Sequence, residues 1–525
     1  MRLGWRWART VIGMTVLGWV GMLTACSSGE VQAPPDTGAC EDTVDGDCSA
    51  APEPAPNDGG DIPQPVEEPP QEEDPGDTSQ DPTPEPLPPP PGPGATLWEA
   101  REGTPQDDLA LDAAVDATGD IFTAAVHGID DLDTRNRSDD KVSLVLTRRS
   151  ADGETRWQRT FEVRAPETPA ELHADVRAQV AVDPAGGLYL AGNVKGLLDF
   201  ETRELGDGAF VARLDANGTL VWASRPSGNG LTVVDLAVDA QGRALVAFNS
   251  PGGADFGGGT HGSGAVVVTY STDGQAEHSL SIGRPEGQED AVELTTLAAD
   301  GRGRMAVGGR YVGAVRFGNQ RVASTRDGSP FFALYSDGAL TWARALQHAR
   351  GSVTAVGLDG QGEVVATGPF LGTVDWAGKK LQGHPYRYSP FLLSTQSGGQ
   401  ERWGRNLGDG LQAGALAVDS AGEVVVGGFT YNRIEDGAAS SDGMGSSQPV
   451  ALRYDATGAV VATRLFLSDP PQPRGELAGL EAMPNVAVLP GGDALLFGHT
   501  DRESDFGPGR RSAARGDIFL LRLKR

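Results

Sequence analysis

Residues 178–222, AQVAVDPAGGLYLAGNVKGLLDFETRELGDGAFVARLDANGTLVW, decide the fold, because related copies fill the chain after its first hundred residues. The first apolar run, 178–182, ends in Asp183-Pro184-Ala185-Gly186. Asp, Pro and Gly at the first, second and fourth positions are typical of a type I turn. A second apolar run, 187–191, follows at once, so the two runs are predicted to form a β-hairpin.

The second half of the stretch repeats this arrangement. After a glycine-punctuated loop containing Asp199-Phe200, a third strand is predicted over 209–214. It reaches a second turn of the same kind at 215–218, and a fourth strand begins through Trp222. One copy is therefore predicted to be a four-stranded antiparallel meander that needs like neighbours to bury its apolar faces.

Seven copies of the first turn are spaced near sixty residues apart, which is the length that four strands with generous loops need. The turns lie at 116–119, 183–186, 239–242, 300–303, 359–362, 419–422 and, in degenerate form, 489–492. High glycine and proline content and the lack of a helical apolar period agree with many short strands. The sequence therefore predicts an all-β repeat protein.

A second marker shows how the copies are joined. Glycine followed four residues later by Trp ends the copies at Trp157, Trp222, Trp342 and Trp403, whereas His278 and Ala462 stand at that position in two others. The seventh marker is at the beginning of the region, Gly94 to Trp98, while the last copy stops at Arg525 after its third strand. The N-terminal strand is therefore predicted to complete the C-terminal copy and to close a ring, with Leu97 and Trp98 beside Phe519 and Leu521.

Residues 96–525 thus resemble the bacterial seven-bladed β-propeller repeats found in secreted proteins and lipoproteins. The resemblance rests on the Asp-x-x-Gly hairpin, the Gly-x-x-x-Trp ending and an aromatic loop between the second and third strands. That loop reads Asp199-Phe200, Asp255-Phe256-Gly257, Arg316-Phe317-Gly318, Asp375-Trp376 and Asp505-Phe506-Gly507. The resemblance implies an all-β, seven-bladed propeller of four-stranded antiparallel blades, closed by pairing of the N-terminal strand with the C-terminal blade. It implies no particular activity.

The first 26 residues have the order of a secretory signal. Arg2, Arg6 and Arg9 precede an apolar run that is too short for a convincing membrane span. The Leu-Thr-Ala-Cys ending at Cys26 resembles the lipobox of bacterial lipoproteins, and this resemblance implies cleavage before Cys26 and attachment of lipid acyl chains such as palmitate to it. The alternative is an ordinary secretory signal with a chance cysteine.

Residues 27–95 are predicted to be a disordered, acidic, proline-rich linker. They contain half of the prolines of the chain and almost no large apolar residue. Within them, Cys40 and Cys48 enclose four carboxylate residues. The pair is interpreted as a small disulfide loop of an oxidising compartment, and the alternative is a loop that binds a hard cation such as calcium.

The charge excludes one class of partner. The formal net charge is −29, of which −17 lies in residues 27–95, and residues 96–525 still carry −15. Because an acidic body repels phosphate backbones, no nucleic-acid partner is expected.

The repeated aromatic residues and turn aspartates are interpreted as structural: packing between blades for Trp98, Trp157, Trp222, Trp342 and Trp403, and turn geometry for the aspartates. The seven histidines show no metal-ligand spacing, and no metal, cofactor or catalytic residue is predicted. Polar residues before the first strands, which are expected to line a central channel, are the candidates for a site at its mouth: Asp107, Asp108, His173, Asp175, Asp235, Glu289 and Asp290. Their alternative role is as solvated loop charges.

The predicted function is that of a monomeric cell-envelope lipoprotein, at the outer membrane or cell surface, whose propeller binds or scaffolds an unknown protein or glycan. The alternative is a polysaccharide lyase or hydrolase with a site at the channel mouth. The two hypotheses differ in whether carboxylates, histidine or arginine from three or more blades converge in a concave pocket.

Overall fold

The computed structural model describes residues 91–129, 142–165, 174–325, 327–430, 448–468, 485–500, 503–507, 509–511 and 517–525. Within these ranges the regular elements are β-strands, and the paired strands run antiparallel. None of the described segments forms a helix long and apolar enough to span a membrane. Cys26, Cys40, Cys48 and residues 27–90 of the predicted linker lie outside the described residues, whereas residues 91–95, also predicted as linker, are ordered as a turn that leads into the first strand.

The stretch at 178–222 forms the predicted meander, called sheet 2 here. Its strands are β6 (Asp175–Val182), β7 (Leu188–Lys195), β10 (Gly208–Leu214) and β11 (Leu220–Ser224), in the order β11-β10-β7-β6. The first turn closes as predicted, with the Gly186 N–H donating to the Asp183 carbonyl over 2.9 Å. Gly186 has a φ of 82°, which a residue with a Cβ rarely adopts.

The other six sheets repeat this order. Sheets 1, 3 and 4 are β2 (Asp107–Val115), β3 (Ile121–Ile129), β4 (Val142–Arg149), β5 (Thr155–Arg164); β13 (Thr232–Val238), β14 (Ala244–Ser250), β17 (Gly264–Tyr270), β18 (Ala276–Ser281); and β20 (Ala291–Ala299), β21 (Arg304–Val312), β24 (Ser329–Ser336), β25 (Ala339–Ala345). Sheets 5 and 6 are β27 (Ala355–Leu358), β28 (Val364–Trp376), β30 (Ser389–Thr395), β31 (Glu401–Asn406); and β32 (Leu411–Val418), β33 (Val424–Thr430), β34 (Gln448–Tyr454), β35 (Val460–Leu465). Sheet 7 is β37 (Asn485–Val488), β38 (Ala494–Thr500), β41 (Asp517–Leu523) and, at its outer edge, β1 (Thr96–Glu102).

Short strands in the connections pair one sheet with the next. The segment that leaves a sheet hydrogen-bonds to the hairpin that follows the second strand of its neighbour, as β12 (Ser227–Gly228) does with β15 (Ala254–Asp255). The remaining short strands are β8 (Leu197–Asp199), β9 (Glu204–Leu205), β16 (Thr260–His261), β19 (Arg284–Pro285), β22 (Ala314–Phe317), β23 (Gln320–Ala323), β26 (Ala349–Gly351), β29 (Lys379–Gln382), β36 (Leu467–Ser468), β39 (Ser504–Asp505) and β40 (Arg510–Arg511).

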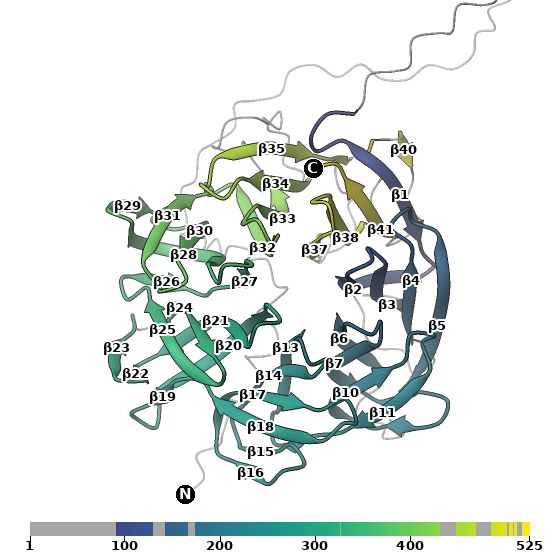
Figure 1. Cartoon of the computed structure of the whole chain (residues 1–525), viewed down its shortest axis with the longest axis horizontal. Helices are drawn as coiled ribbons and strands as arrows, with labels where there is room; N and C mark the ends of the chain where they lie inside the picture. Colours follow the sequence, from purple (N-terminus) through teal and green to yellow (C-terminus); the bar gives the residue numbers. More distant parts are fainter. Residues whose placement is uncertain are drawn as a thin grey trace, which may run out of the picture. The chain divides into compact units, whose positions relative to one another are not determined.

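The hydrophobic core of the described residues lies between the sheets. It divides into seven clusters, each formed by two sheets that are neighbours in sequence, except that one cluster joins sheet 7 to sheet 1. That last cluster contains Ile121 and Ala125 from sheet 1 and Phe497 and Leu520 from sheet 7. Figure 1 shows the first strand of each sheet toward the centre and the fourth strand outside.

The predicted pairing of the two ends of the repeat region is confirmed. β1 runs antiparallel to β41 in six residue pairs, among them Trp98 with Arg522 and Glu99 with Leu521. The N-terminal strand is therefore the fourth strand of the C-terminal sheet, and β41 has no unpaired edge (Figure 1).

The two ends of the repeat region also form a hairpin turn, although they are not consecutive in the sequence. The Gly94 N–H donates to the Lys524 carbonyl over 2.8 Å, and the Lys524 N–H donates to the Ala95 carbonyl over 2.9 Å. In sheet 1 the continuous turn between the third and fourth strands makes the same two bonds, from Gly153 to Ser150 and from Ser150 to Glu154. This hairpin turn therefore has its usual hydrogen bonds although its two strands, β41 and β1, are not consecutive in the sequence.

The contact between sheets 7 and 1 reproduces a contact made by continuous chain. The indole of Trp98 and the guanidinium of Arg522 both donate to the Ala151 carbonyl over 2.9 Å. One interface further on, Trp157 and Arg148 donate to the Ala216 carbonyl over 2.9 Å and 3.0 Å. The same bonds therefore cross the interface whether or not the third and fourth strands are covalently connected.

Removing residues 1–102 is expected to lower the thermal midpoint of unfolding, because it removes β1, exposes the edge of β41 and deletes Trp98 from the core between sheets 7 and 1. Removing residues 1–90 keeps β1 and serves as the control, with an unchanged midpoint. Differential scanning calorimetry and light scattering measure unfolding and edge-driven association. Equal midpoints for the two truncations would contradict a stabilising role for the exchanged strand.

Candidate functional site

The repeated Trp residues connect neighbouring sheets. Each indole N–H donates to a main-chain carbonyl in the turn between the third and fourth strands of the next sheet. The pairs are Trp98–Ala151, Trp157–Ala216, Trp222–Thr272 and Trp342–Ser397 at 2.9 Å, and Trp403–Ala456 at 3.0 Å. The prediction that these Trp residues pack between copies is confirmed. Their indole N–H groups are already bonded to main chain and are not free to bind a ligand.

The glycine of the Gly-x-x-x-Trp marker belongs to the same contact. A Cβ added at Gly458 would lie 2.6 Å from Cδ2 of Trp403 in the preceding sheet, and Gly458 has a φ of 81°. Gly274 is placed likewise against Trp222, at 2.7 Å. Gly153, Gly218 and Gly399 likewise receive the Trp ring of the preceding sheet, and the Trp four residues after each of them extends to the following sheet. Gly274 and Gly458 receive a ring but precede His278 and Ala462, and Gly338, which follows the sheet with His278, has no neighbouring atom within 4 Å of an added Cβ.

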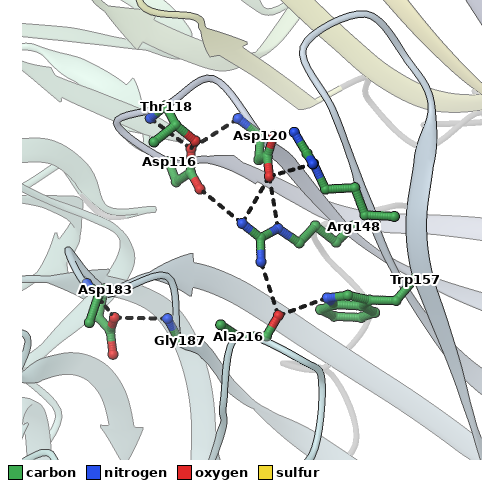
Figure 2. Close-up of polar contacts among 10 residues, drawn as sticks. Asp116, Thr118, Asp120, Arg148, Trp157, Asp183, Gly187 and Ala216 are labelled. Carbon is green, nitrogen blue, oxygen red and sulfur yellow. Dashed lines mark hydrogen bonds and ion pairs between the residues drawn. The ribbon is translucent and has the colours of Figure 1, made fainter.

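Arginine on the third strand reinforces the contact, as Figure 2 shows for Arg148. Its Nε lies 2.9 Å from Asp120 Oδ2 in its own sheet, while its NH1 reaches the Ala216 carbonyl that also accepts from Trp157. Asp120 is buried, and its carboxylate fixes the guanidinium toward the neighbouring sheet. These charged groups are thus engaged in holding two sheets together.

The aspartates of the repeated turns have structural roles, as predicted. Asp183 Oδ1 accepts the N–H groups of Ala185 and Gly187, each over 2.8 Å. The same two bonds, to the second and fourth residues after the aspartate, occur at Asp116, Asp215, Asp239, Asp300, Asp359, Asp419 and Asp455. A carboxylate committed to two N–H groups stabilises its turn.

Polar side chains on the first strands bond to the main chain of the next sheet. The pattern covers interfaces 1 to 2, 3 to 4, 4 to 5 and 7 to 1. The bonds are Val180 N–H to Asp112 Oδ2 at 2.8 Å, Leu297 N–H to Asp235 Oδ2 at 2.6 Å, Val356 N–H to Thr296 Oγ1 at 3.2 Å, and Asn485 Nδ2 to the Leu111 carbonyl at 2.7 Å. These residues occupy one repeat position, four residues before the first turn.

Two asparagines on second strands each make a pair of hydrogen bonds, one donated and one accepted, as a peptide group does in a sheet. Asn193 donates to the Leu231 carbonyl over 3.2 Å and accepts from the Val233 N–H over 2.8 Å. Asn249 bonds to both main-chain groups of Leu294, over 2.8 Å and 2.9 Å. They link sheet 2 to sheet 3 and sheet 3 to sheet 4.

Burial changes the ionisation of the two aspartates on the first strands. It raises the pKa of Asp112 from 3.8 to about 7, against the opposing bond from Val180 and with a further raising effect from the Asp235 charge. It raises the pKa of Asp235 from 3.8 to about 6, against bonds from Leu297, Leu236 and Thr296. Both side chains keep part of their surface accessible, yet protein surrounds them closely enough to disfavour the charged form.

The other predicted channel-mouth residues do not converge. Asp108 is fully buried and accepts the N–H groups of Thr104 at 2.5 Å and Gly128 at 3.1 Å. Asp175 lies 3.6 Å from Arg177, and Asp290 accepts the Gly287 N–H over 2.6 Å. Asp107 begins β2, Glu289 is exposed, and His173 lies outside the described residues. Among the described residues no group of three or more His, Cys, Asp or Glu is arranged to hold a metal ion.

A cleft of about 380 Å³ lies where the chain passes from sheet 2 to sheet 3. Its wall includes Asp207, Ala209, Arg225, Pro226, Ser227 and Leu231. The Arg225 guanidinium donates to the Asp207 carbonyl, and it makes no ion pair within the described parts of the chain. The volume is within the range of small-ligand sites, and an arginine in the wall suits an anionic group.

No single sequence motif predicts this cleft, because Arg225 and Pro226 follow the Trp marker and belong to no recognised pattern. A comparison of the copies with one another carries the signal, since proline occurs at that position in sheet 2 alone among the seven copies. The prediction that the channel-mouth residues precede the first strands is wrong for Asp108 and Asp235, which lie within β2 and β13 and are bound to main-chain N–H groups.

Replacing Asp112 by Asn is expected to change the free energy of unfolding differently at pH 8 and at pH 3. The variant gains up to about 4 kcal/mol over the wild type between pH 3 and pH 8, because each unit by which the Asp112 pKa is raised costs the wild type about 1.36 kcal/mol. Because the folded-state pKa of about 7 exceeds the ordinary 3.8, the wild type loses stability as pH rises between these values. Asn stays neutral and keeps an oxygen for the Val180 N–H. Denaturant unfolding at several pH values tests this, and a pH-independent difference between the two proteins would contradict it.

No family model and no curated protein matches the chain. Solved structures with similar folds include a polysaccharide lyase described as an ulvan lyase, with 9% identity over 81% of this chain and 96% of that one and a TM-score of 0.45. Polysaccharide lyase Uly1 has 12% identity over 82% and 99%, with a TM-score of 0.43. A Dyadobacter fermentans protein of unknown function has 10% identity over 82% and 98%, with a TM-score of 0.39. Similarities at this level carry no conclusion about substrate or site.

Proposed function

We propose that residues 96–525 form a closed seven-bladed β-propeller that acts as a non-catalytic binding or scaffolding module of the cell envelope. Each of the seven sheets is one blade in this proposal, and the exchanged strand β1 completes the last one. Support for closure comes from the core cluster between sheets 7 and 1, which makes the same kind of contact as the six between consecutive sheets.

The observation that carries the proposal is the commitment of the repeated polar groups to the turns within sheets and to the interfaces between them. The indole N–H groups, the turn aspartates and the first-strand carboxylates of Asp112 and Asp235 are bonded to main chain. A catalytic site needs side chains whose polar atoms remain free to meet a reacting group. A frame whose repeated side chains hold it rigid, with a cleft in its wall, is suited to binding.

Binding without turnover is the expected behaviour of the full-length protein. Peptide and acidic-polysaccharide libraries offered to the immobilised protein are expected to yield a saturable ligand that is recovered chemically unchanged. Mass spectrometry of the recovered ligand is the measurement, with heat-unfolded protein as the control. Release of shortened or unsaturated oligosaccharides at a steady rate would overturn the binding module in favour of a lyase or hydrolase.

The proposed location follows from the first 95 residues. Lipid on Cys26 would anchor the protein in the envelope, at the outer membrane or cell surface, and the acidic linker at 27–95 would hold the monomeric propeller away from the bilayer. The partner is then a protein or glycan outside the cytoplasm, with no nucleic acid and no cofactor required. Cys40 and Cys48 would form a disulfide loop in that compartment.

Replacing Cys26 by Ser is expected to release the protein from the membrane fraction, because the thiol that carries the lipid is lost. Detergent phase partitioning of the two proteins is the measurement. Replacing Cys40 by Ser, which leaves the proposed anchor in place, is the matched control and is expected to stay with the membranes. Continued membrane association of the Cys26 variant would contradict the anchor.

A further inference from the structure

The residue four positions after the repeated Trp has a constant role in most sheets. It is large and apolar, and it is buried to 8% exposure or less. The residues are Phe161, Ile282, Leu346, Leu407 and Phe466. In sheets 1 and 6 this residue is Phe, and its ring contacts the Phe of the aromatic loop in the next sheet. The ring centroids are 4.9 Å apart for Phe161–Phe200 and 5.5 Å apart for Phe466–Phe506.

The same residue also makes a main-chain bond to the start of the third strand. Its N–H donates to a carbonyl of its own sheet in sheets 3 to 6. The bonds are Ile282 to Ala265, Leu346 to Pro330 and Leu407 to Pro390 at 2.9 Å, and Phe466 to Pro449 at 3.0 Å. In sheets 3 to 6 one residue therefore supplies both an N–H donor and a buried apolar side chain.

Pro226 supplies neither in sheet 2. Proline has no N–H, so the Ala209 carbonyl, which is equivalent to Ala265, does not receive this bond. The proline ring is also smaller than the Phe, Ile or Leu side chain of sheets 1 and 3 to 6, while sheet 7 has Glu102 at this position, paired with Arg149 of sheet 1. The cleft of about 380 Å³ has Ala209, Pro226 and Leu231 in its wall, so it lies where the repeated donor and side chain are missing.

Arg225 adds a fixed positive charge at the same place. Its guanidinium is held by the Asp207 carbonyl and passes alongside Gly208, where an added Cβ would be 3.8 Å from Nε. Ser227, Gly228 and Gly230 also line the cleft. The arginine N–H groups that are not bonded to Asp207 suit a carboxylate, for which the planar guanidinium has matching geometry.

We propose that this cleft binds the C-terminal residue of a partner protein, with a large apolar side chain and a free carboxylate. The incoming N–H takes the Ala209 carbonyl, the side chain fills the space that Pro226 leaves, and the carboxylate pairs with Arg225. The occupant thereby restores from outside the donor and the side chain that sheets 3 to 6 supply from within. This inference rests on the proposed function as a binding module and names its ligand class.

The test uses the full-length protein and fluorescein-labelled heptapeptides ending in Leu, Phe or Ile. Fluorescence anisotropy is expected to show saturable binding of the free acids. Binding of the matched C-terminal amides, and of a free acid ending in Ser, is expected to be about tenfold weaker or more, because a charge-assisted bond or a buried apolar side chain is lost. Equal binding of acid and amide, or no binding of the free acids up to millimolar concentration, would overturn the proposal.

Three variants locate the site. Pro226→Leu restores the repeated residue and is expected to abolish binding while keeping or raising the thermal midpoint, so that loss of binding is not loss of folding. Arg225→Gln is expected to weaken the free acid about tenfold and the amide much less. Arg284→Gln, in the next connection and outside the cleft, is the matched control and is expected to bind as the wild type.

Undiminished peptide binding by Pro226→Leu would overturn the site, while leaving the proposed binding function intact. Binding of an acidic oligosaccharide that Pro226→Leu abolishes, with no binding of the peptides, would overturn the ligand class alone. Chemical conversion of any bound ligand would instead overturn the proposed function itself.

Discussion

The noncovalent junction between β1 and β41 is the constraint on which the rest of the described structure depends. Each sheet buries its faces against two neighbours, so the first and last sheets need each other. Bringing distant chain ends together costs entropy that grows slowly, by about 0.6 kcal/mol for each doubling of loop length. The junction offsets this cost with a six-pair ladder, the turn between Gly94 and Lys524, and the bonds of Trp98 and Arg522 to Ala151.

Several kinds of polar contact hold the interfaces together, and where the repeated Trp is absent other side chains make hydrogen bonds or ion pairs to the next sheet. Between sheets 3 and 4, His278 stands in the Trp position, and Asn249 and Asp235 bond to the first strand of sheet 4. Between sheets 6 and 7, where Ala462 replaces the Trp, Arg453 donates to the Gly492 carbonyl over 2.6 Å, and Arg525 pairs with Glu423. The contacts between neighbouring sheets therefore do not depend on any one repeated side chain.

The sequence predicted what is encoded locally or by repetition: the turns, the four-stranded copies and the exchange of the terminal strand. It did not predict the partners across interfaces, because the acceptor of Trp157 is the carbonyl of Ala216, and every residue has a carbonyl. Asp235 was interpreted by residue type as a channel-mouth carboxylate, whereas its position relative to the Leu297 N–H depends on how two sheets are placed. Pro226 was readable in principle, since a missing N–H is a property of the residue itself.

The cleft lies at the interface between sheets 2 and 3, where the stabilising free energy lost at Pro226 is offset by other contacts. A smaller residue at a buried apolar position costs about 2–5 kcal/mol in well-packed cores, and a lost hydrogen bond costs about 1 kcal/mol more. This interface retains Trp222 on the Thr272 carbonyl, the buried Tyr189 hydroxyl on the Gly242 carbonyl at 2.8 Å, and both bonds of Asn193. An interface held by these bonds tolerates an opening beside Pro226, and there a ligand can add what the chain omits without separating the sheets.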